Sequence, residues 1–542
     1  MMFEVGRDVS KQGLMGTDTN SVGRARIKFV YAVFLGLFIL FAGRTLQLAI
    51  HGTDRVRLAG AANSWQVNRA DIIDRNGDIL AKNVMSGHIT LRPHQVKDKQ
   101  AVAELIHEIL PYEYSVNQAL KLLDSSKRFM YVKKYVSDAQ RKAVESAKLA
   151  GLEIEANQAR KYPKRRLFSH VVGFVGNDGR GLEGAERIYD EYLRDNKEPL
   201  QLSLDSRIQS VFYEQLTAAM QRYQAKNAMG LLMNSSTGEM IAMVSLPDFD
   251  PENLSLDPMA NRLFKPLRGT YEMGSIFKVF NTAMAMENGI HKEYYVKEAY
   301  KIRDKFGRVA AKIGDVASFR PPRPNLSVEE IMLHSCNAGS AQIALDLPEG
   351  TQPEFFHRIH LDEPLNLEFG ETERTLMPRK WGPVERATVS FGHGISVTPM
   401  HLLLGVNSMI NGGFYIYPTL QKRNFGPMRA QRVLSDDISA RLRGIMLRIA
   451  EETSAKQARI SGIQIGGKTA TAEKRVNGKI DKFKNLTAFV GIFPVNAPQY
   501  TILVVLDEPK GTKESFGLRT AAWNAVPTAG KILDSILPLL FE

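Results

Sequence analysis

The sequence predicts an α+β fold in which five strands are flanked by helices. Four apolar runs have the length and composition of strands. They occupy residues 229–233, 240–244, 486–493 and 500–506. A fifth strand-like series begins at Lys468, an amphipathic helix opens at 202–209, and residues 525–537 repeat apolar side chains at helical spacing. Strands in one sheet with helices packed beside it form an α+β plan.

Length and composition limit the class of protein. The chain has 542 residues, enough for two or three domains, and is 44% hydrophobic and 24% charged, so it can bury sizeable cores. Its formal net charge is +13. We expect no nucleic-acid partner, because no nucleic-acid motif and no dense Lys/Arg block with interleaved aromatics is present. An anionic membrane and cell wall would explain the charge as well.

The N-terminal region predicts a membrane anchor. Residues 29–50 form an apolar run about long enough to span a bilayer, with Arg44 near one end. The preceding basic residues are Arg24, Arg26 and Lys28. By the positive-inside rule, residues 1–28 are a cytoplasmic tail and the later domains lie outside the cytoplasm. The alternative is a cleaved signal peptide processed near residues 59–62, for which the leading region is long.

Residues 51–200 follow with a hairpin and then helical patterns. The segment 68–80 has an apolar pair, an Asn-Gly turn and a second apolar pair, which predicts a β-hairpin. Residues 98–150 alternate helical patterns with Lys/Arg-rich turns. The three aspartates of the hairpin could suggest a calcium loop, but the later glutamate of such a loop is missing, so we expect a structural role. They are Asp71, Asp74 and Asp78.

The stretch 271–278 carries the main candidate chemistry. Ser275 and Lys278 are three residues apart, so on a helix they share a face. A serine hydroxyl needs a neighbouring base, and a lysine can be that base if its pKa is lowered by burial or nearby cations. Gly274 allows a tight turn into the helix, whose free N–H groups suit an oxyanion. An S-x-x-K pair alone also occurs by chance in chains of this length.

Two later motifs complete a set. Ser335-Cys336-Asn337 lies between two apolar helical patterns, and Lys468-Thr469-Ala470-Thr471 follows two glycines. Serine acyl-transferases that react with penicillin carry S-x-x-K, S-x-N and K-T-G in this order. From about Gly23 onward the chain resembles the class B penicillin-binding proteins, most of all the division-specific FtsI-type peptidoglycan D,D-transpeptidases. The segments 68–80, 160–163 and 169–190 resemble the opening motifs of their extracytoplasmic part.

The resemblance implies an architecture. It implies the penicillin-binding/transpeptidase fold, with a five-stranded antiparallel sheet flanked by helices and a helical subdomain beside the active site. An elongated pedestal domain would cover residues 51–200, and the catalytic domain residues 201–542. The single transmembrane helix would hold both in the periplasm, at the inner membrane of a cell with two membranes.

The resemblance also implies roles. Ser275 would attack the carbonyl between the terminal D-alanines of a peptidoglycan stem peptide, and Lys278 would accept its proton. Ser335 would relay protons and Asn337 would bind the substrate amide and Lys278. The remaining motif would bind substrate. Lys468 would offer a positive charge to the terminal carboxylate, and Thr469 would line the same side of the active site. The backbone N–H groups of Thr471 and Ser275 would form the oxyanion hole. We expect no metal and no cofactor.

Four other residues could suggest chemistry, and we favour structural roles for all of them. Cys336 could be a nucleophile, but a small buried residue between functional neighbours explains it. His393, in the glycine-rich loop 391–399, could be a general acid, although relatives often carry Gln there. His170 and Glu183 have no nucleophile nearby in sequence, and we expect them to form hydrogen bonds between subdomains.

Two departures from the family pattern leave rival functions open. Met273 stands where proline is usual and Ala470 where glycine is usual, on a strand whose backbone approaches the substrate.

The leading hypothesis is a septal D,D-transpeptidase that β-lactams acylate and that works with an FtsW-type membrane glycosyltransferase and other division proteins. Alternatives are an elongation-specific transpeptidase, a catalytically weakened division scaffold, and a hydrolase such as a D,D-carboxypeptidase.

Overall fold

The computed structural model describes residues 28–29, 31–43, 69–316, 319–423, 426–427, 429–476 and 479–541. The chain divides into two compact units. Among the described residues, the small unit contains residues 87–157, and the large unit contains residues 69–86 and those after 157. The chain passes between them within strands β2 (Ile79–Leu91) and β4 (Leu152–Lys161).

Residues 31–43 are helical, and they are the longest continuous described part of the expected anchor. Within the described ranges, no helix has both the length and the apolar character needed to cross a membrane. The expected anchor 29–50 lies only partly inside these ranges, and the expected tail 1–28 lies almost wholly outside them.

The small unit packs three helices with short strands. The helices are α2 (Lys99–Ile109), α3 (Val116–Leu123) and α4 (Asp138–Ala147). α3 and α4 each begin with a capping box, at Ser115 and Ser137, which satisfies N–H groups of the first turn. Strand β3 (Met130–Lys133) pairs antiparallel with the end of β2. The expected helices of residues 98–150 are confirmed, whereas β3 is too short to produce a readable alternation.

The large unit begins with the expected hairpin. Strand β1 (Ile72–Ile73) pairs antiparallel with the start of β2 and parallel with β7 (Leu200–Gln201). The fully buried Asp74 carboxylate accepts hydrogen bonds from the backbone N–H groups of Asn76, Asp78 and Ser206. This aspartate therefore closes the turn and ties it to the start of a helix, as its expected structural role requires.

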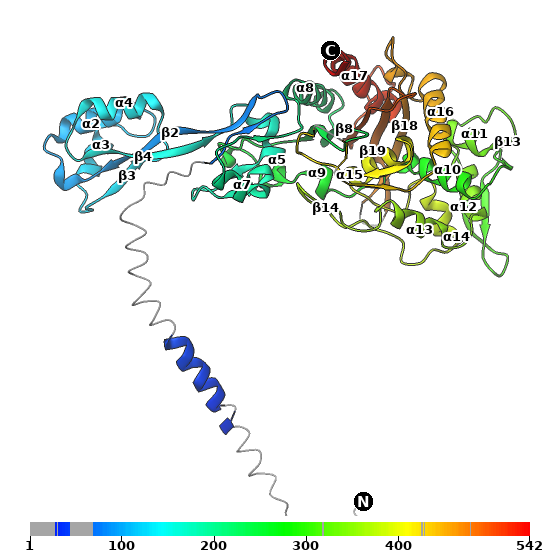
Figure 1. Cartoon of the computed structure of the whole chain (residues 1–542), viewed down its shortest axis with the longest axis horizontal. Coiled ribbons are helices and arrows are strands. Elements are labelled where there is room, and N and C mark those ends of the chain that lie inside the picture. Colours follow the sequence, from blue (N-terminus) through cyan, green and yellow to red (C-terminus); the bar gives the residue numbers. More distant parts are fainter. Residues whose placement is uncertain are drawn as a thin grey trace, which may run out of the picture. The chain divides into compact units, whose positions relative to one another are not determined.

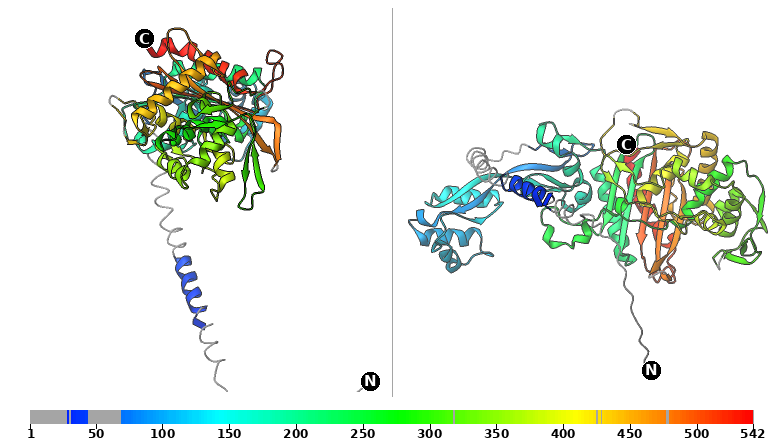
Figure 2. Two further views of the ribbon diagram at one scale, coloured as in Figure 1. Left: turned by 90° about the vertical axis from the view of Figure 1, so that its right-hand side faces the viewer. Right: turned by 90° about the horizontal axis from the view of Figure 1, so that it is seen from below.

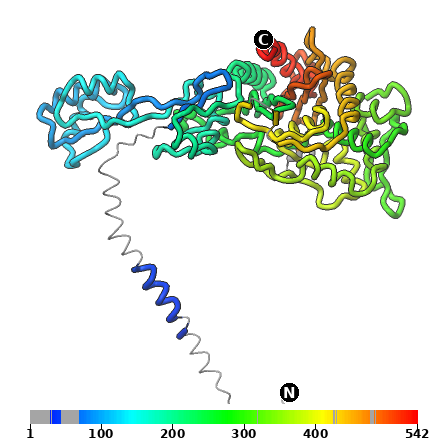
Figure 3. The backbone as a smooth tube through the Cα atoms, in the orientation of Figure 1, coloured from blue at the N-terminus to red at the C-terminus, as the bar shows by residue number. Residues whose placement is uncertain are grey.

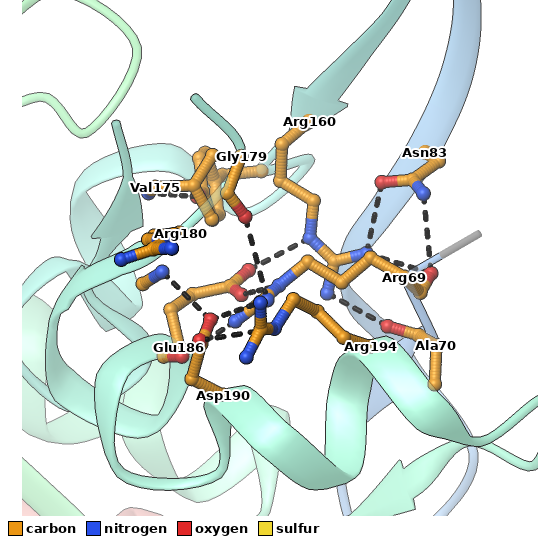
Figure 4. A network of polar contacts seen from close by, with 12 residues as sticks. Arg69, Ala70, Asn83, Arg160, Val175, Gly179, Arg180, Glu186, Asp190 and Arg194 are labelled. Carbon is orange, nitrogen blue, oxygen red and sulfur yellow. Dashed lines mark hydrogen bonds and ion pairs between the residues drawn. The ribbon is translucent and has the colours of Figure 1, made fainter. Parts of the chain in front are cut away.

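A buried ion network holds the next segment in place (Figure 4). Glu186 is fully buried on α6 (Gly184–Ile188), and its carboxylate accepts hydrogen bonds from the guanidinium groups of Arg69 and Arg160. The bond from Arg160 Nε to Glu186 Oε1 is 2.7 Å long. Arg69 also donates to Asp190 Oδ1 at 2.7 Å. Breaking one partner of such a buried pair typically costs about 3–5 kcal/mol, because the remaining charge is left uncompensated. The network therefore fixes the hairpin to helices distant in sequence.

The same region contains short elements that connect the hairpin to the main sheet. They are η2 (Arg165–Phe168), α5 (Ser169–Val172), β5 (Phe174–Val175), β6 (Gly181–Glu183) and α7 (Asp190–Asp195). His170 on α5 packs against Phe249 and contacts the Asn261 carbonyl oxygen through Nε2 at 2.7 Å. Burial lowers the pKa of His170 to about 4, so it is neutral at pH 7. Its expected role as a structural hydrogen-bonding residue is confirmed.

The main sheet has the five expected strands, all antiparallel, in the order β18-β19-β20-β8-β9. Their bounds are β8 Asn227–Asn234, β9 Met240–Leu246, β18 Gly466–Val476, β19 Lys479–Phe493 and β20 Tyr500–Asp507. β18, which carries the Lys468 motif, is an edge strand of this sheet among the described strands.

Helices from both ends of the large unit cover the sheet. α8 (Ser206–Arg222) contacts β8 and β9, and α17 (Ala525–Phe541) contacts β19, β20 and α8. Figure 3 shows α8 and α17 side by side although 302 residues separate their ends. α15 (Pro399–Ile410) packs against β20, and α16 (Asp436–Glu452) packs against β18.

A group of helices lies beside the sheet, on the right-hand side of the molecule in Figure 1. It contains α10 (Lys278–Glu287), α11 (Val328–Leu333), α12 (Asn337–Asp346), α13 (Thr351–Arg358) and α14 (Pro383–Val389). α10 contacts α11, α12, α15 and α16, so it lies between the helical group and the helices against the sheet. The α+β transpeptidase-type arrangement expected from the sequence is present.

Shorter pieces complete the unit. One hairpin, β11 (Tyr300–Arg303) with β12 (Val309–Ile313), projects from the helical group, where it is green in the left view of Figure 2. The other pairs are β10 (Glu293–Tyr295) with β13 (Asn325–Ser327), β14 (Asn366–Leu367) with β15 (Gly370–Glu371), and β16 (Phe414–Ile416) with β17 (Ala430–Arg432). Short helices are η3 (Leu254–Leu256), η4 (Met259–Arg262), α9 (Lys265–Arg268), η6 (Lys456–Ala458) and η7 (Ala521–Trp523).

Candidate active site

The S-x-x-K segment forms a tight turn rather than one regular helix. Met273 is fully buried, and Gly274 has a φ of +50°, a conformation that glycine adopts without steric cost. Ser275 lies in the 3-10 turn η5 (Gly274–Phe277), and Lys278 is the first residue of α10. The expectation that both lie on a single helix is corrected in this detail. In a 3-10 turn, residues three apart eclipse each other, so the two side chains still meet.

Lys278 is the centre of a hydrogen-bond cluster. Its Nζ donates to Ser275 Oγ at 3.0 Å, to Asn337 Oδ1 at 2.6 Å, and to Ser335 through the carbonyl oxygen at 2.7 Å and Oγ at 3.3 Å. The residue is 1% exposed. Three segments far apart in the sequence are therefore joined at one amine, and the four expected catalytic residues lie together.

Burial lowers the pKa of Lys278 to about 8, partly opposed by the negative charge of Asp315. At pH 7 about a tenth of such a lysine is neutral, roughly 300-fold more than for an ordinary lysine. A neutral amine at hydrogen-bond distance from a serine hydroxyl can take its proton. The cluster therefore has the geometry and basicity for activating Ser275.

Ser335 stands between two lysines. Lys468 on β18 donates to Ser335 Oγ at 3.0 Å and to the Thr469 carbonyl oxygen at 3.2 Å, so the same hydroxyl contacts Lys278 and Lys468. Ser335 has a φ of +58°, which is rare for a residue other than glycine and costs on the order of 1 kcal/mol or more. Such strain is typical of residues whose position is fixed by function.

Lys468 is almost fully buried, and its environment disfavours positive charge. Burial lowers its pKa well below the usual value, and the neighbouring Lys278 lowers it further. The sequence predicts that Lys468 offers a positive charge to a carboxylate. Its hydrogen-bond partners in the described part of the chain are a hydroxyl and a carbonyl oxygen, so a substrate carboxylate would supply the negative charge that stabilises protonated Lys468.

Asp315 organises the S-x-N motif and was missed by the sequence analysis. Its carboxylate accepts a short hydrogen bond from the Asn337 N–H, a 3.2 Å contact from Cys336 Sγ and a 3.4 Å bond from the Ala338 N–H. These groups begin α12, where a carboxylate satisfies free N–H groups and opposes the helix dipole. Since Asp315 comes from a different segment, no local pattern marks it.

Cys336 is fully buried, and burial raises the pKa of its thiol to about 12, with Asp315 contributing. The thiolate is the reactive form of cysteine, so this thiol is inert at neutral pH. The structural interpretation of Cys336 is supported.

Strand β18 presents its two threonines differently from Lys468. Side chains alternate along a strand, so Lys468 and Ala470 share one face and Thr469 and Thr471 the other. The Thr469 hydroxyl contacts Ser454 Oγ at 2.9 Å, and the Thr471 hydroxyl accepts from the Ala521 N–H at 3.0 Å. The structure thus brings the strand to the site, whereas the two threonine hydroxyls contact neighbouring segments.

The backbone of Thr471 nevertheless lies against η5, the turn that carries Ser275 and is called the nucleophile turn below. A Cβ on Gly274 would lie 3.4 Å from the Thr471 carbonyl oxygen. The backbone of β18 and the start of η5 are therefore adjacent.

The glycine-rich loop 391–394 supports the same turn from another side. A Cβ on Gly392 would lie 2.2 Å from the Gly274 carbonyl oxygen, so the two backbones touch. His393 Nδ1 contacts Glu272 Oε2 at 2.9 Å, and the Gly394 N–H donates to Glu272 Oε1 at 3.1 Å. His393 is thus bound to a residue of the turn, which supports its structural interpretation. Glu272 was not singled out from the sequence.

Within the described ranges, no group of three or more His, Cys, Asp and Glu side chains is arranged to hold a metal ion.

Comparisons with known proteins identify the family of this chain. Residues 228–528 match the penicillin-binding protein transpeptidase domain, and residues 64–215 match the penicillin-binding protein dimerisation domain. The chain therefore belongs to the penicillin-binding protein transpeptidases. Its combination of the two domains makes it a class B, FtsI-like member.

Individual relatives are similar over most of their length. The probable peptidoglycan D,D-transpeptidase FtsI of Caulobacter vibrioides is 31% identical over 89% of this chain and 83% of that protein. The stage V sporulation protein D of Bacillus subtilis is 27% identical over 96% and 87%, and the peptidoglycan D,D-transpeptidase FtsI of Escherichia coli is 26% identical over 94% and 92%.

A crystal structure of a peptidoglycan synthetase from Bifidobacterium adolescentis has the same fold. It superposes with a TM-score of 0.65 at 19% sequence identity, covering 87% of this chain and 95% of that one.

Proposed function

We propose that this protein is a serine D,D-transpeptidase that cross-links peptidoglycan stem peptides during septal wall synthesis. The observation that carries the proposal is the buried Lys278 amine, with a pKa of about 8, at 3.0 Å from the Ser275 hydroxyl. The domain match and the names of the relatives support the reaction, and the FtsI names support the septal role.

In the acylation step, Ser275 Oγ attacks the carbonyl carbon between the two terminal D-alanines. Its proton passes to neutral Lys278, and the carbonyl oxygen becomes an oxyanion facing the N–H groups of Ser275 and Thr471. The C–N bond then breaks, and the leaving amine of D-alanine receives a proton from Lys278 through the Ser335 hydroxyl. This hydroxyl bridges both lysines, which supports its role as a relay.

The substrate backbone would extend the main sheet. β18 is an edge strand, so a bound peptide can take main-chain hydrogen bonds along it. Lys468, Thr469 and Thr471 would line this edge. The terminal carboxylate of the substrate would lie near Lys468, and its negative charge would stabilise the protonated form of this lysine. Asn337 would bind the substrate amide while it holds Lys278.

In the second step, an amine of a neighbouring stem peptide attacks the Ser275 ester. The amine passes its proton through Lys278 to Ser275 Oγ as the C–O bond of the ester breaks, and a new amide joins the two strands. A β-lactam would acylate the same serine, and its opened ring would remain attached.

We also propose the cellular setting implied by the sequence. Residues 29–50 would anchor the chain in the inner membrane, with residues 1–28 in the cytoplasm. Residues 51–200 would form the pedestal, and residues 201–542 the catalytic domain in the periplasm. An FtsW-type glycosyltransferase and other division proteins would be partners, since a cross-linking enzyme needs newly polymerised strands.

Covalent labelling with a fluorescent penicillin tests the proposed chemistry. Wild-type protein should be labelled, and mass spectrometry should place the adduct on Ser275. Ser275→Ala should abolish labelling without changing the melting temperature, whereas Ser340→Ala, at a buried serine outside the Lys278 cluster, should still be labelled. An adduct on Ser335 or Cys336 would refute the assignment of roles. Absence of any adduct would favour the weakened division scaffold instead.

A further inference from the structure

The β11–β12 hairpin exposes a basic face that the chemistry of Ser275 does not use. Between residues 297 and 312, six residues are basic and two, Glu298 and Asp304, are acidic. The basic residues are Lys297, Lys301, Arg303, Lys305, Arg308 and Lys312. All six are exposed. The hairpin therefore carries a local excess of positive charge.

The two strands have different faces. Ile302 and Ile313 are buried in a small cluster with Ala341 of α12 and Ala387 of α14, so this face fastens the hairpin to the helical group. The strand register places Lys301 directly opposite Lys312 on the other face. Their side chains therefore point away from the cluster and toward solvent.

The pairing of Lys301 with Lys312 is unfavourable for the isolated hairpin. Like charges directly opposite each other on neighbouring strands destabilise the pair. Within the described part of the chain, neither lysine has a recorded ion pair, whereas Arg308 is paired with Asp304. An acidic partner lying across the two strands would relieve this repulsion.

The tip of the hairpin adds an aromatic surface. Phe306 is 69% exposed, and the side chains of Lys305 and Arg308 lie over its ring at 5.0 Å and 5.1 Å. An exposed aromatic ring beside cations fits a ligand that presents both apolar sugar faces and carboxylates.

The hairpin leads directly to the active site. Asp315, which holds the start of the S-x-N helix, comes three residues after Lys312, at most about 10 Å of extended chain. The hairpin from Phe306 to Lys312 is about 20 Å long at the rise per residue of a β-strand. A polymer bound along the hairpin would therefore be delivered close to Ser335 and Asn337.

We propose that the outer face of this hairpin binds the acidic, uncross-linked peptidoglycan strand, with Lys301 and Lys312 taking stem-peptide carboxylates and Phe306 a sugar ring. The inference rests on the proposed function, because it assigns the strand as the polymer that carries the substrate. It goes beyond that function by placing a polymer-binding surface outside the catalytic cluster. The proximity to Asp315 favours the substrate polymer over a lipid surface as the partner.

The test measures binding of the full-length protein to fluorescent, uncross-linked glycan strands bearing stem peptides. Lys301→Glu combined with Lys312→Glu should weaken this binding by about fivefold or more, and high salt should weaken binding of the wild type in the same direction. The control pair, Lys226→Glu with Lys531→Glu, makes the same change in net charge at exposed positions elsewhere and should leave binding within about twofold. Phe306→Ala should also weaken binding.

Two further measurements separate the possible outcomes. Glycan strands whose stem-peptide carboxylates are amidated should bind the wild-type protein weakly. The affinity should equal that of unmodified glycan strands for the variant that combines Lys301→Glu and Lys312→Glu. Acylation by a small penicillin should be unchanged in the hairpin variants, so a failure of the catalytic proposal would appear there and not in strand binding. Equal loss in both charge-reversed pairs, or no loss in either, overturns the proposal. Loss of binding to anionic phospholipid vesicles with strand binding intact overturns it as well, and makes the hairpin a membrane contact.

Discussion

At the scale of single residues, the site is defined by two buried lysines around one serine hydroxyl. Lys278 and Lys468 each donate to Ser335 Oγ, so their nitrogens lie within about 6 Å of each other. Two full positive charges at this distance repel by roughly 3 kcal/mol at an effective dielectric constant of about 20. This repulsion opposes full charge on both lysines at once, so it favours a neutral amine in the cluster.

The pH dependence of acylation tests this base. Lys278 has a pKa lowered to about 8, and the groups around it are Lys468, Asp315 and Cys336. The neutral amine is the active form, so the second-order rate of acylation by a penicillin should rise with pH and level off above about 8. The measurement is this rate from about pH 6 to about pH 10.

A matched variant completes the pH experiment. Lys278→Arg keeps a cation that does not deprotonate in this range, so acylation should fall by about a hundredfold or more and lose its pH dependence. A wild-type rate that falls as pH rises through 8 would show that the protonated lysine is the active form, and the proposed base would be wrong.

At the scale of elements, the nucleophile turn is held by backbone contact with the glycine-rich loop. Gly392 and Gly394 both have φ near +78°, at +79° and +77°, so alanine at either position carries similar backbone strain. Their surroundings differ. A Cβ on Gly392 would meet Gly274 backbone atoms at 2.2–2.7 Å, whereas a Cβ on Gly394 meets only Thr388 Oγ1 at 3.6 Å.

Alanine variants at Gly392 and Gly394 therefore distinguish the effect of backbone strain from the effect of displacing the Ser275 turn. Gly392→Ala should push the turn that carries Ser275 and reduce penicillin acylation by about a hundredfold or more, since a shift of about 1 Å can have that effect. Gly394→Ala should cost about 1–2 kcal/mol of stability with acylation within about tenfold. Comparable acylation by the two variants would show that the contact with Gly274 does not position the nucleophile.

Ala470 is the second question at this scale, because relatives usually have glycine there. The residue is 3% exposed and belongs to the main core, and the alternation of β18 places it opposite Thr469. Its neighbour on the same face, Ala472, would lie 3.4 Å from a Cβ on Gly274. The methyl group therefore lies on the buried face of β18 that also carries Lys468, and it points across the strand's hydrogen-bonding edge and does not block that edge.

Restoring glycine should accordingly change little. Ala470→Gly should alter the acylation rate by less than about tenfold, or roughly 1.4 kcal/mol of barrier. Ala472→Gly, on the same buried face, serves as the control for the loss of a methyl group. A gain of a hundredfold or more in the Ala470 variant alone would show that alanine cripples the site, and the scaffold function would then be favoured.

At the scale of the whole molecule, the sequence predicted what depends on local pattern. The five strands of the main sheet, the α8 and α17 helices and the Asn-Gly hairpin have readable periodicity or turn chemistry, and all are present. The cluster of Ser275, Lys278, Ser335, Asn337 and Lys468 was predicted through the resemblance of three short motifs to those of a known family, because no local pattern shows that these segments meet.

The rest depends on contacts between distant segments. Asp315 caps a helix that begins 22 residues later, and Glu272 binds a loop 121 residues away. A single carboxylate in a loop has no periodic or turn signature that would mark such a partner. The 3-10 form of the Ser275 turn was missed for a related reason, since it is set by packing of Gly274 against Gly392 and β18.

The last prediction concerns the membrane topology of the whole chain. Residues 29–50 are apolar and follow Arg24, Arg26 and Lys28, so the chain should retain this segment as an anchor with its N-terminus in the cytoplasm. Protease added to spheroplasts of cells that express the protein should then digest everything except a short N-terminal fragment. A tag after Met1 would identify that fragment by immunoblot.

Two variants test the cause of this orientation. Replacing the three preceding basic residues by glutamate removes the positive-inside signal, so a substantial fraction of the chain should become protected from protease. Replacing the same number of basic residues inside the large unit, at Lys226, Lys456 and Lys531, should leave digestion unchanged, because long translocated domains pass the membrane largely regardless of charge. Recovery of a mature chain that begins near residues 59–62 would show instead that the segment is a cleaved signal peptide. Full protection of the wild-type chain would place the catalytic unit on the wrong side of the membrane for peptidoglycan, and the proposed function would fail with it.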